Sequence, residues 1–218
     1  MIDTVLFDLD GTVIDTNELI IQTFLHVFKD QTAPFPLTRE LIISFMGKPL
    51  LDLMRYYSGR EHVDDLIEAY REFNTANHDE LVKEIPYVRE VLTTLHEQGI
   101  QLGIVTTKIR STSLKGLEFC GLDKLIQAIV TIEDVDYPKP HPQPVLRAME
   151  ALGADPQRTA MVGDTGFDIQ AANGAGITSI GVGWSLQSEK DLRLFQPDYI
   201  NHDMRDLLPL VGLKGILL

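Results

Sequence analysis

The chain has 218 residues, a length that suits one large domain or one core domain with a smaller insertion, and its 44% hydrophobic and 23% charged residues exclude a disordered chain. Its formal net charge of −13 argues against nucleic acids and anionic membranes as partners. The single cysteine, Cys120, excludes an internal disulfide and predicts a small buried thiol in a reducing compartment.

The N-terminal residues run directly into a short apolar segment. Met1 to Asp3 carry no basic leader, and no part of the chain approaches the roughly 18 apolar residues of a membrane span. We therefore expect a cytoplasmic protein. Residues 5–7 are apolar and end at Asp8, which predicts a buried strand with polar residues at its carboxyl end, and Gly11 then turns the chain.

The next part of the chain shows helical periodicity and no convincing strand. We expect a polar, proline-containing loop at residues 31–36 and helices at residues 19–28, 39–45, 50–57 and 63–81. The interpretation is a helical cap domain of residues 16–82, inserted into a core domain made of residues 1–15 and 83–218.

After the insertion, apolar runs alternate with helical patterns that mostly end at glycines. The strands are expected at residues 102–105, 126–132, 160–162 and 178–182, and the helices at residues 87–98, 111–119, 144–152 and 168–173. This alternation predicts an α/β fold with a Rossmann-like parallel sheet covered by helices on both faces. The apolar tail, residues 213–218, is expected to pack on the core or on a partner.

The strongest chemical motif is Asp8-Leu9-Asp10-Gly11-Thr12, directly after the first apolar run. Two carboxylates at i and i+2 can point into one pocket, where one attacks phosphorus and the other donates and later accepts a proton. A calcium-binding loop would need an acidic or amide residue at Thr12 and a glutamate at Leu19, so that alternative fails. A plain acidic turn is the other alternative.

Two further motifs also follow apolar runs. Thr106-Thr107-Lys108 offers a hydroxyl and backbone N–H groups to phosphate oxygens, although a plain turn into a helix has the same composition. Gly163-Asp164 is followed by Asp168, and Asp164 together with Asp8 would make a hard oxygen site for Mg²⁺. Asp168 would orient a metal-bound water or a lysine, or would only complement a helix dipole.

The remaining motif is a lysine enclosed by prolines, Pro138-Lys139-Pro140-His141-Pro142. A fixed ammonium group there can neutralise both an attacking carboxylate and an incoming phosphate. The alternative is a surface turn with a solvated lysine.

Taken in order, these motifs resemble the four-motif signature of the haloacid dehalogenase-like phosphatases, and the insertion falls where that family carries a helical cap. The resemblance implies an Mg²⁺-dependent phosphohydrolase in which Asp8 becomes an aspartyl phosphate. It implies that Asp10 is the general acid and base, and that Asp10 separates this chain from the dehalogenase branch. It further implies that Thr106 and Lys139 hold the phosphoryl group, that Mg²⁺ is bound by Asp8, Asp164 and the Asp10 backbone carbonyl, and that Asp168 supports the site.

The inserted segment is expected to select the substrate, a small phosphorylated molecule. The candidate contacts are Asn17, Glu18, Lys48 and Arg71 in the insertion and Thr107 and Lys108 in the core. A solvated helix face is the alternative for Arg71. The oligomeric state is left open by the sequence.

Several segments are also similar to the bacterial pyrophosphatases of the PpaX type, among them residues 17–21, 70–74, 78–82, 104–108 and 184–186. This resemblance implies inorganic pyrophosphate as the substrate. The sequence departs from that branch at Gly47-Lys48-Pro49, where Gly-Pro-Pro is expected. The alternatives are a phosphoglycolate phosphatase or another small monoester phosphatase, a sugar phosphate mutase, a non-catalytic phosphate-binding regulator, and a structural protein that uses its apolar tail. The pair of Asp8 and Asp10 argues against a regulator.

Overall fold

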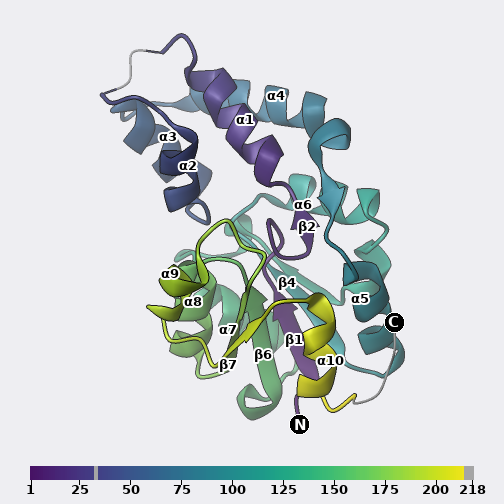
Figure 1. The fold of residues 1–218 in the computed structure, drawn as a ribbon. Helices are drawn as coiled ribbons and strands as arrows, with labels where there is room; N and C mark the ends of the chain where they lie inside the picture. The colour runs from purple at the N-terminus through teal and green to yellow at the C-terminus, as the bar shows by residue number, and fades with distance from the viewer. Residues whose placement is uncertain (32–33, 214–218) are drawn as a thin grey trace.

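Six parallel strands form the centre of the structure, a computed structural model that describes residues 1–31 and 34–213 (Figure 1). The sheet order is β5-β4-β1-β6-β7-β8, which confirms the predicted Rossmann-like α/β fold. In register, Phe7 of β1 lies beside Ile104 of β4 and Val162 of β6, so the residues that follow these three strands meet at one edge. The strands are β1 (Thr4–Phe7), β4 (Gln101–Val105), β5 (Ala128–Val130), β6 (Thr159–Gly163), β7 (Thr178–Val182) and β8 (Tyr199–Asn201).

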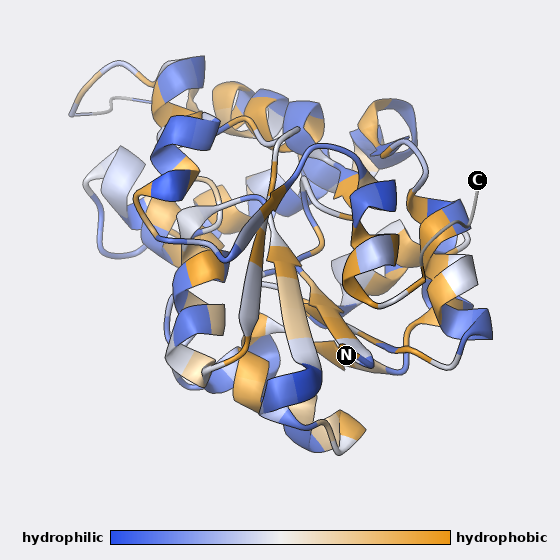
Figure 2. Cartoon of the chain, turned by 60° about the horizontal axis from the view of Figure 1, so that its bottom comes forward, coloured by the Kyte–Doolittle hydropathy of each residue, from blue (hydrophilic) through white to orange (hydrophobic). Residues whose placement is uncertain are grey.

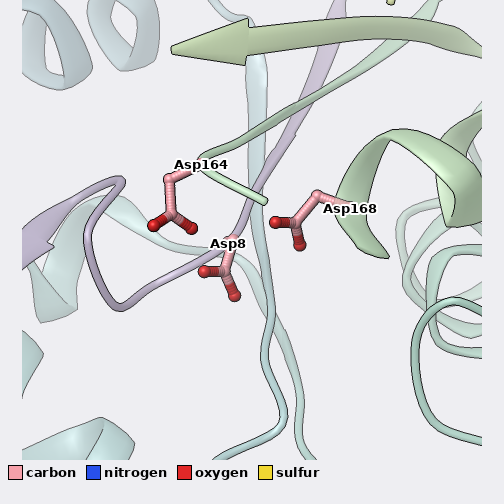
Figure 3. Close-up of side chains that lie close together, drawn as sticks. All are labelled: Asp8, Asp164 and Asp168. Carbon is pink, nitrogen blue, oxygen red and sulfur yellow. The ribbon is translucent and has the colours of Figure 1, made fainter. Parts of the chain in front are cut away.

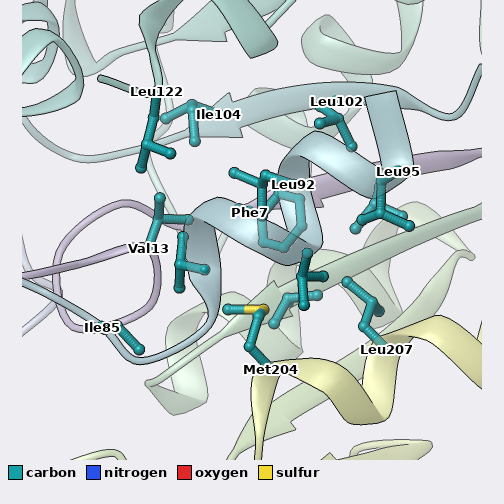
Figure 4. Close-up of a cluster of buried hydrophobic side chains, with 14 of the residues drawn as sticks. Phe7, Val13, Ile85, Leu92, Leu95, Leu102, Ile104, Leu122, Met204 and Leu207 are labelled. Atoms are coloured by element: carbon teal, nitrogen blue, oxygen red, sulfur yellow. The ribbon is translucent and has the colours of Figure 1, made fainter. Parts of the chain in front are cut away.

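Helices cover both faces of the sheet because side chains alternate along each strand. Phe7 points to one face and packs in a buried cluster with residues of α5, α6 and α10 (Figure 4). Leu6 points to the other face and packs with residues of α7 and α8. The helices are α5 (Val88–Glu97), α6 (Arg110–Phe119), α7 (Gln143–Leu152), α8 (Gly166–Ala175), α9 (Glu189–Arg193) and α10 (Leu207–Leu210).

The hydropathy of the chain follows this layering. Figure 2 shows hydrophobic residues along the central strands, whereas the helices carry both hydrophobic and hydrophilic residues. Cys120 is 3% exposed and belongs to the cluster around Phe7, which confirms the predicted buried thiol. Burial also raises the pKa of this thiol. None of the helices in the described part of the chain combines the length and the apolar character needed to cross a membrane.

Four helices gather at the end of the molecule next to the carboxyl edge of the sheet (Figure 1). They have a hydrophobic cluster of their own, in which Phe24 packs edge-on against Tyr57 with ring centroids 5.5 Å apart. The chain enters and leaves this helical segment through an antiparallel pair of short strands, β2 (Ile14–Asp15) and β3 (Lys83–Glu84). The helices are α1 (Asn17–Phe28), α2 (Arg39–Phe45), α3 (Leu50–Ser58) and α4 (Asp64–Leu81).

The predicted elements differ from the observed ones mainly at their ends. The strand expected at residues 126–132 is limited to β5, because Thr131 caps a short 3-10 turn at Ile132–Asp134 and bonds the Asp134 side chain. The short elements β2, β3, β8, α9 and α10 were missed. In the predicted apolar tail, Leu213 packs against the core, while residues 214–218 lie outside the described residues, as do residues 32–33 of the predicted loop.

Candidate active site

The candidate site lies at the carboxyl edge of the sheet, where Asp8, Thr106 and Asp164 directly follow β1, β4 and β6. The backbone N–H of Asp8 donates to the carbonyl of Val162 at 2.9 Å, and that of Thr106 donates to Val130 at 2.9 Å. These bonds extend the sheet by one residue and fix where each side chain leaves the backbone. This edge is also the place where open parallel sheets bind ligands.

Three buried carboxylates converge there. Asp8, Asp164 and Asp168 each bring an oxygen within 4.8 Å of the others (Figure 3). The predicted metal ligands were Asp8, Asp164 and the backbone carbonyl of Asp10, so the cluster contains both predicted carboxylates, with Asp168 as a third.

The electrostatics of this cluster favour a cation. Burial raises the pKa of Asp8 to about 7, against the opposing effect of the Lys139 ammonium group, and the nearby carboxylates of Asp168 and Asp10 raise it further. Burial and the charge of Asp8 also raise the pKa of Asp164 well above its usual value. In addition, Asp164 Oδ1 is buried without a hydrogen-bond partner. An all-oxygen set with an unpaired acceptor and excess negative charge fits Mg²⁺.

Lys139 is the positive group of the cluster and is only 4% exposed. Its Nζ donates to Asp8 Oδ1 at 2.6 Å, to Asp168 Oδ1 at 2.6 Å and to the carbonyl of Val105 at 2.9 Å. The three N–H protons are therefore all used. Burial lowers the pKa of Lys139, but the attraction of the two carboxylates outweighs burial, so its pKa lies above the usual lysine value and the group stays charged.

Asp168 links this lysine to helix α8. Its Oδ2 accepts hydrogen bonds from the backbone N–H of Thr165 at 3.0 Å and from the Thr165 hydroxyl at 2.7 Å. The Thr165 side chain in turn accepts from the backbone of Asp168, which makes a capping box at the start of the helix. Because Asp168 Oδ1 holds Lys139, the cap of α8 and the position of the lysine depend on the same side chain.

Asp10 is held by two donors at the edge of the site. Its Oδ1 accepts from the hydroxyl of Thr16 and from the Nζ of Lys108, both at 2.5 Å. The turn at Gly11 that brings Asp10 here has φ of 78°, and a Cβ on Gly11 would lie 2.5 Å from Asp164 Oδ2. Only glycine satisfies both the left-handed backbone and this close approach.

A cavity of about 240 Å³ opens between the four-helix segment and the sheet edge. The core end of the cavity is lined by Asp8, Asp10 and Asp164. The other lining residues include the polar residues Lys48, Arg71, Asn74, Thr107 and Lys108, and Ile20, Phe24, Leu53, Ile67 and Tyr70. Several of these residues come from the turn at Gly47 and from helix α4. The turn packs on the core, because a Cβ on Gly47 would lie 2.9 Å from the ring of Phe167.

Comparison with known proteins agrees with this geometry. Residues 5–182 match the family described as haloacid dehalogenase-like hydrolase. The chain belongs to this family. The result confirms the resemblance stated from the motifs, and it makes the chain a hydrolase rather than a non-catalytic regulator.

Individual relatives of this hydrolase match over nearly its whole length. Pyrophosphatase PpaX from Anoxybacillus flavithermus is 45% identical over 214 residues, covering 98% of this chain and 99% of that protein. Pyrophosphatase PpaX from Halalkalibacterium halodurans is 46% identical, with 98% and 99% covered. The structure of a haloacid dehalogenase-like family hydrolase from Streptococcus pneumoniae superposes with a TM-score of 0.82 at 27% identity, covering 96% of this chain and 98% of that one.

The structure of the hydrolase brings most, but not all, of the predicted site residues to the cavity. Glu18 lies outside the cavity lining and pairs with Arg39 on α2. Thr106 is buried behind the lining, where its hydroxyl oxygen accepts from the N–H of Lys108 at 3.1 Å and keeps its proton free to donate. The amide oxygen of Asn17 is buried near Gly11 without a partner.

From the sequence, no site role was assigned to three residues that the structure places at the site. Tyr70 and Asn74 lie three and seven positions after Ile67 on α4, so helical spacing was the signal that could have found them. Trp184 donates from Nε1 to the carbonyl of Gly11 at 3.1 Å, which supports the turn that carries Asp10.

Proposed function

We propose that this hydrolase cleaves inorganic pyrophosphate through an aspartyl phosphate on Asp8. The observation that carries the proposal is the charge of the cavity: Lys48 and Arg71 line it beyond the acidic cluster, in a chain of net charge −13, while Lys108 pairs with Asp10. A cavity with cations beyond the reacting centre suits a substrate with a second anionic group. The relatives named pyrophosphatase support the same substrate.

The proposed reaction has two displacements. An oxygen of Asp8 attacks one phosphorus, the bond to the bridging oxygen breaks, and Asp10 gives its proton to the leaving phosphate. Asp10 then takes a proton from a water molecule that attacks the phosphorus of the aspartyl phosphate and frees Asp8. Thr106 donates to the phosphoryl group, the positive charge of Lys139 stabilises it, and Asp168 keeps Lys139 in place. Bound Mg²⁺, held by Asp8, Asp164 and the Asp10 carbonyl, would supply positive charge beside the phosphate.

In this proposal, residues 16–82 form a cap that closes over the cavity. Water has to be kept out of the cavity during the first displacement and admitted for the second. Closure of the helical segment over the cavity excludes water during the first displacement. Both ends of the segment pass through the β2–β3 pair, so a change there moves α1 to α4 together.

The substrate proposal is tested with a panel of pyrophosphate, 2-phosphoglycolate and several sugar phosphates in the presence of Mg²⁺. We expect kcat/KM for pyrophosphate to exceed the others by at least about tenfold, which equals about 1.4 kcal/mol of transition-state preference. The second candidate is 2-phosphoglycolate, because Lys48 and Arg71 can pair with its carboxylate as well. If 2-phosphoglycolate were the better substrate, the pyrophosphatase proposal would fail while the aspartyl-phosphate chemistry would stand.

The acidic cluster predicts how Mg²⁺ affects stability. Because the pKa of Asp8 is raised to about 7 in the folded protein, the folded state keeps a proton that the unfolded chain loses near its lower pKa. Metal-free stability therefore falls as pH rises from about 4 to about 7. Mg²⁺ replaces this proton, so we expect its addition to raise Tm by several degrees more at about pH 8 than at about pH 5.

Asp164→Asn provides the control, because it removes one negative charge and keeps the side-chain shape. The metal-free variant should be at least as stable as the unmodified protein at about pH 8, and its Tm should respond little to Mg²⁺. Equal Mg²⁺ effects at both pH values, or in both proteins, would argue against a metal site at this cluster. Calorimetry of Mg²⁺ binding gives a readout that does not depend on activity.

A further inference from the structure

Helix α4 presents one face to the cavity. Ile67, Tyr70, Arg71 and Asn74 all line it, and their spacing of three, four and seven residues places them on one side of the helix. Asn74 is the last of the four, nearest in sequence to β3, where the chain returns to the core. The side chain of Asn74 is buried, with 5% exposure, whereas Arg71, three residues earlier on the same helix, is exposed to solvent.

The amide of Asn74 has an unmet hydrogen bond. Its Nδ2 is buried and has no partner among the described residues. By contrast, Asn77 on the same helix donates from its Nδ2 to the carbonyl of Phe73 at 2.8 Å. A buried donor without a partner destabilises a fold, so a fold keeps one only where another gain offsets this cost.

The unpaired polar atoms of the described chain are grouped around the site rather than scattered. The others are all oxygens, Thr12 Oγ1, Asn17 Oδ1 and Asp164 Oδ1, and they lie on or beside the turn that carries Asp10 and in the acidic cluster. Asn74 lines the cavity on its helical wall, and its buried Nδ2 is a donor, so the missing partner is an acceptor.

We propose that Asn74 determines substrate specificity by donating a hydrogen bond to an oxygen of the leaving phosphate. The inference rests on the proposed function. The transferred phosphoryl group faces Asp8, and a displacement in line puts the leaving group on the side away from the nucleophile, which is the side of α4. Lys48 and Arg71 supply charge there, and Asn74 supplies a donor in a fixed position.

A fixed donor rejects substrates that lack the matching acceptor. A leaving group without an acceptor oxygen leaves the Asn74 amide unpaired in the closed cavity, and sites built to bond a polar group discriminate strongly against analogues without it. Lys48 and Arg71 are long side chains that can pair with anions of several shapes. Asn74 is therefore the residue that favours a leaving group with an acceptor oxygen in this position, such as a phosphate, over one without it.

The test compares Asn74→Ala with the control Asn77→Ala. The control removes an amide that lies on the same helix but donates its hydrogen bond to a carbonyl of that helix. We expect Asn74→Ala to lower kcat/KM for pyrophosphate by at least about tenfold, with less than about a threefold change for p-nitrophenyl phosphate, whose leaving group carries no phosphate. Asn77→Ala should leave both rates within about twofold. Asn74→Asp, which keeps the shape but replaces the donor by an acceptor, should lose more than Asn74→Ala.

Binding and stability give a second readout. With Mg²⁺, the non-hydrolysable methylene diphosphonate should raise the Tm of the wild type clearly more than that of Asn74→Ala. Without ligand, Asn74→Leu should melt at or above the wild-type temperature, because an unpaired donor has been removed.

Three outcomes would overturn the proposal. These are a pyrophosphate kcat/KM in Asn74→Ala within about twofold of the wild type, an equal loss for both substrates, and a marked loss of stability in ligand-free Asn74→Leu. Failure of the proposed function is seen separately, in the wild-type panel before any variant is made.

Discussion

Replacing Asp8 with asparagine is expected to abolish turnover of pyrophosphate, by about 10⁴-fold or more, while the chain stays folded. An amide has no anionic oxygen with which to attack phosphorus, so the covalent route is lost. The structure gives no reason for unfolding, because asparagine has the same shape and removes one of three converging negative charges. The measurement is phosphate release at saturating pyrophosphate and Mg²⁺, together with a thermal melt.

The control for this variant is Asp30→Asn, an exposed residue two positions after the end of α1 that does not line the cavity. It should retain the wild-type rate. A folded Asp8→Asn protein that releases phosphate at a rate near that of the wild type would show that Asp8 is not the nucleophile.

Lys139→Met should lose both activity and stability, in contrast to Asp8→Asn. Methionine fills the space of the lysine stem but leaves the carboxylates of Asp8 and Asp168 buried without their cation. Breaking a buried ion pair by removing one partner costs about 3–5 kcal/mol. In a protein of this size, this corresponds to a fall in Tm of roughly 6–20 °C. Turnover should fall by about 10³-fold, because the group that neutralises the attacking carboxylate and the phosphate is missing.

Two further variants separate these effects. Lys108→Met removes a lysine whose ion pair with Asp10 is partly exposed to solvent, so its cost in stability should be near 1 kcal/mol or less. The double variant Lys139→Met with Asp168→Asn should recover part of the lost stability and none of the activity. If Lys139→Met melted within about 2 °C of the wild type, the buried ion pairs of Lys139 would contribute little to the stability of the fold.

The sequence was sufficient to predict the sheet and most of the site for one physical reason. Parallel strands buried on both faces are continuous apolar runs, and each run here stops abruptly at a polar residue. Asp8, Thr106 and Asp164 mark these ends, and the carboxyl ends of neighbouring parallel strands meet at one edge. The sequence alone therefore predicted that these residues, far apart in the chain, lie together at the edge of the sheet.

What the sequence did not predict depends on contacts between distant segments. The pairs Lys108 with Asp10 and Glu18 with Arg39 are set by how the helical segment and the loops pack, not by any local pattern. Strands of two residues such as β2 and β3 are too short to show a period. The burial of Asn74 likewise depends on the packing of α4, since its neighbours in sequence, Phe73 and Thr75, are more exposed.

The β2–β3 pair has an evolutionary consequence. The two places where the chain crosses between the sheet and the helices lie side by side, with Ile14 opposite Glu84 and Asp15 opposite Lys83. Segments whose ends are adjacent are the ones that proteins insert, shorten or exchange with the least disturbance to the rest of the fold. We therefore expect that a lineage with this core can acquire new substrates by replacing everything between these two strands, while the phosphate chemistry at the sheet edge is inherited unchanged.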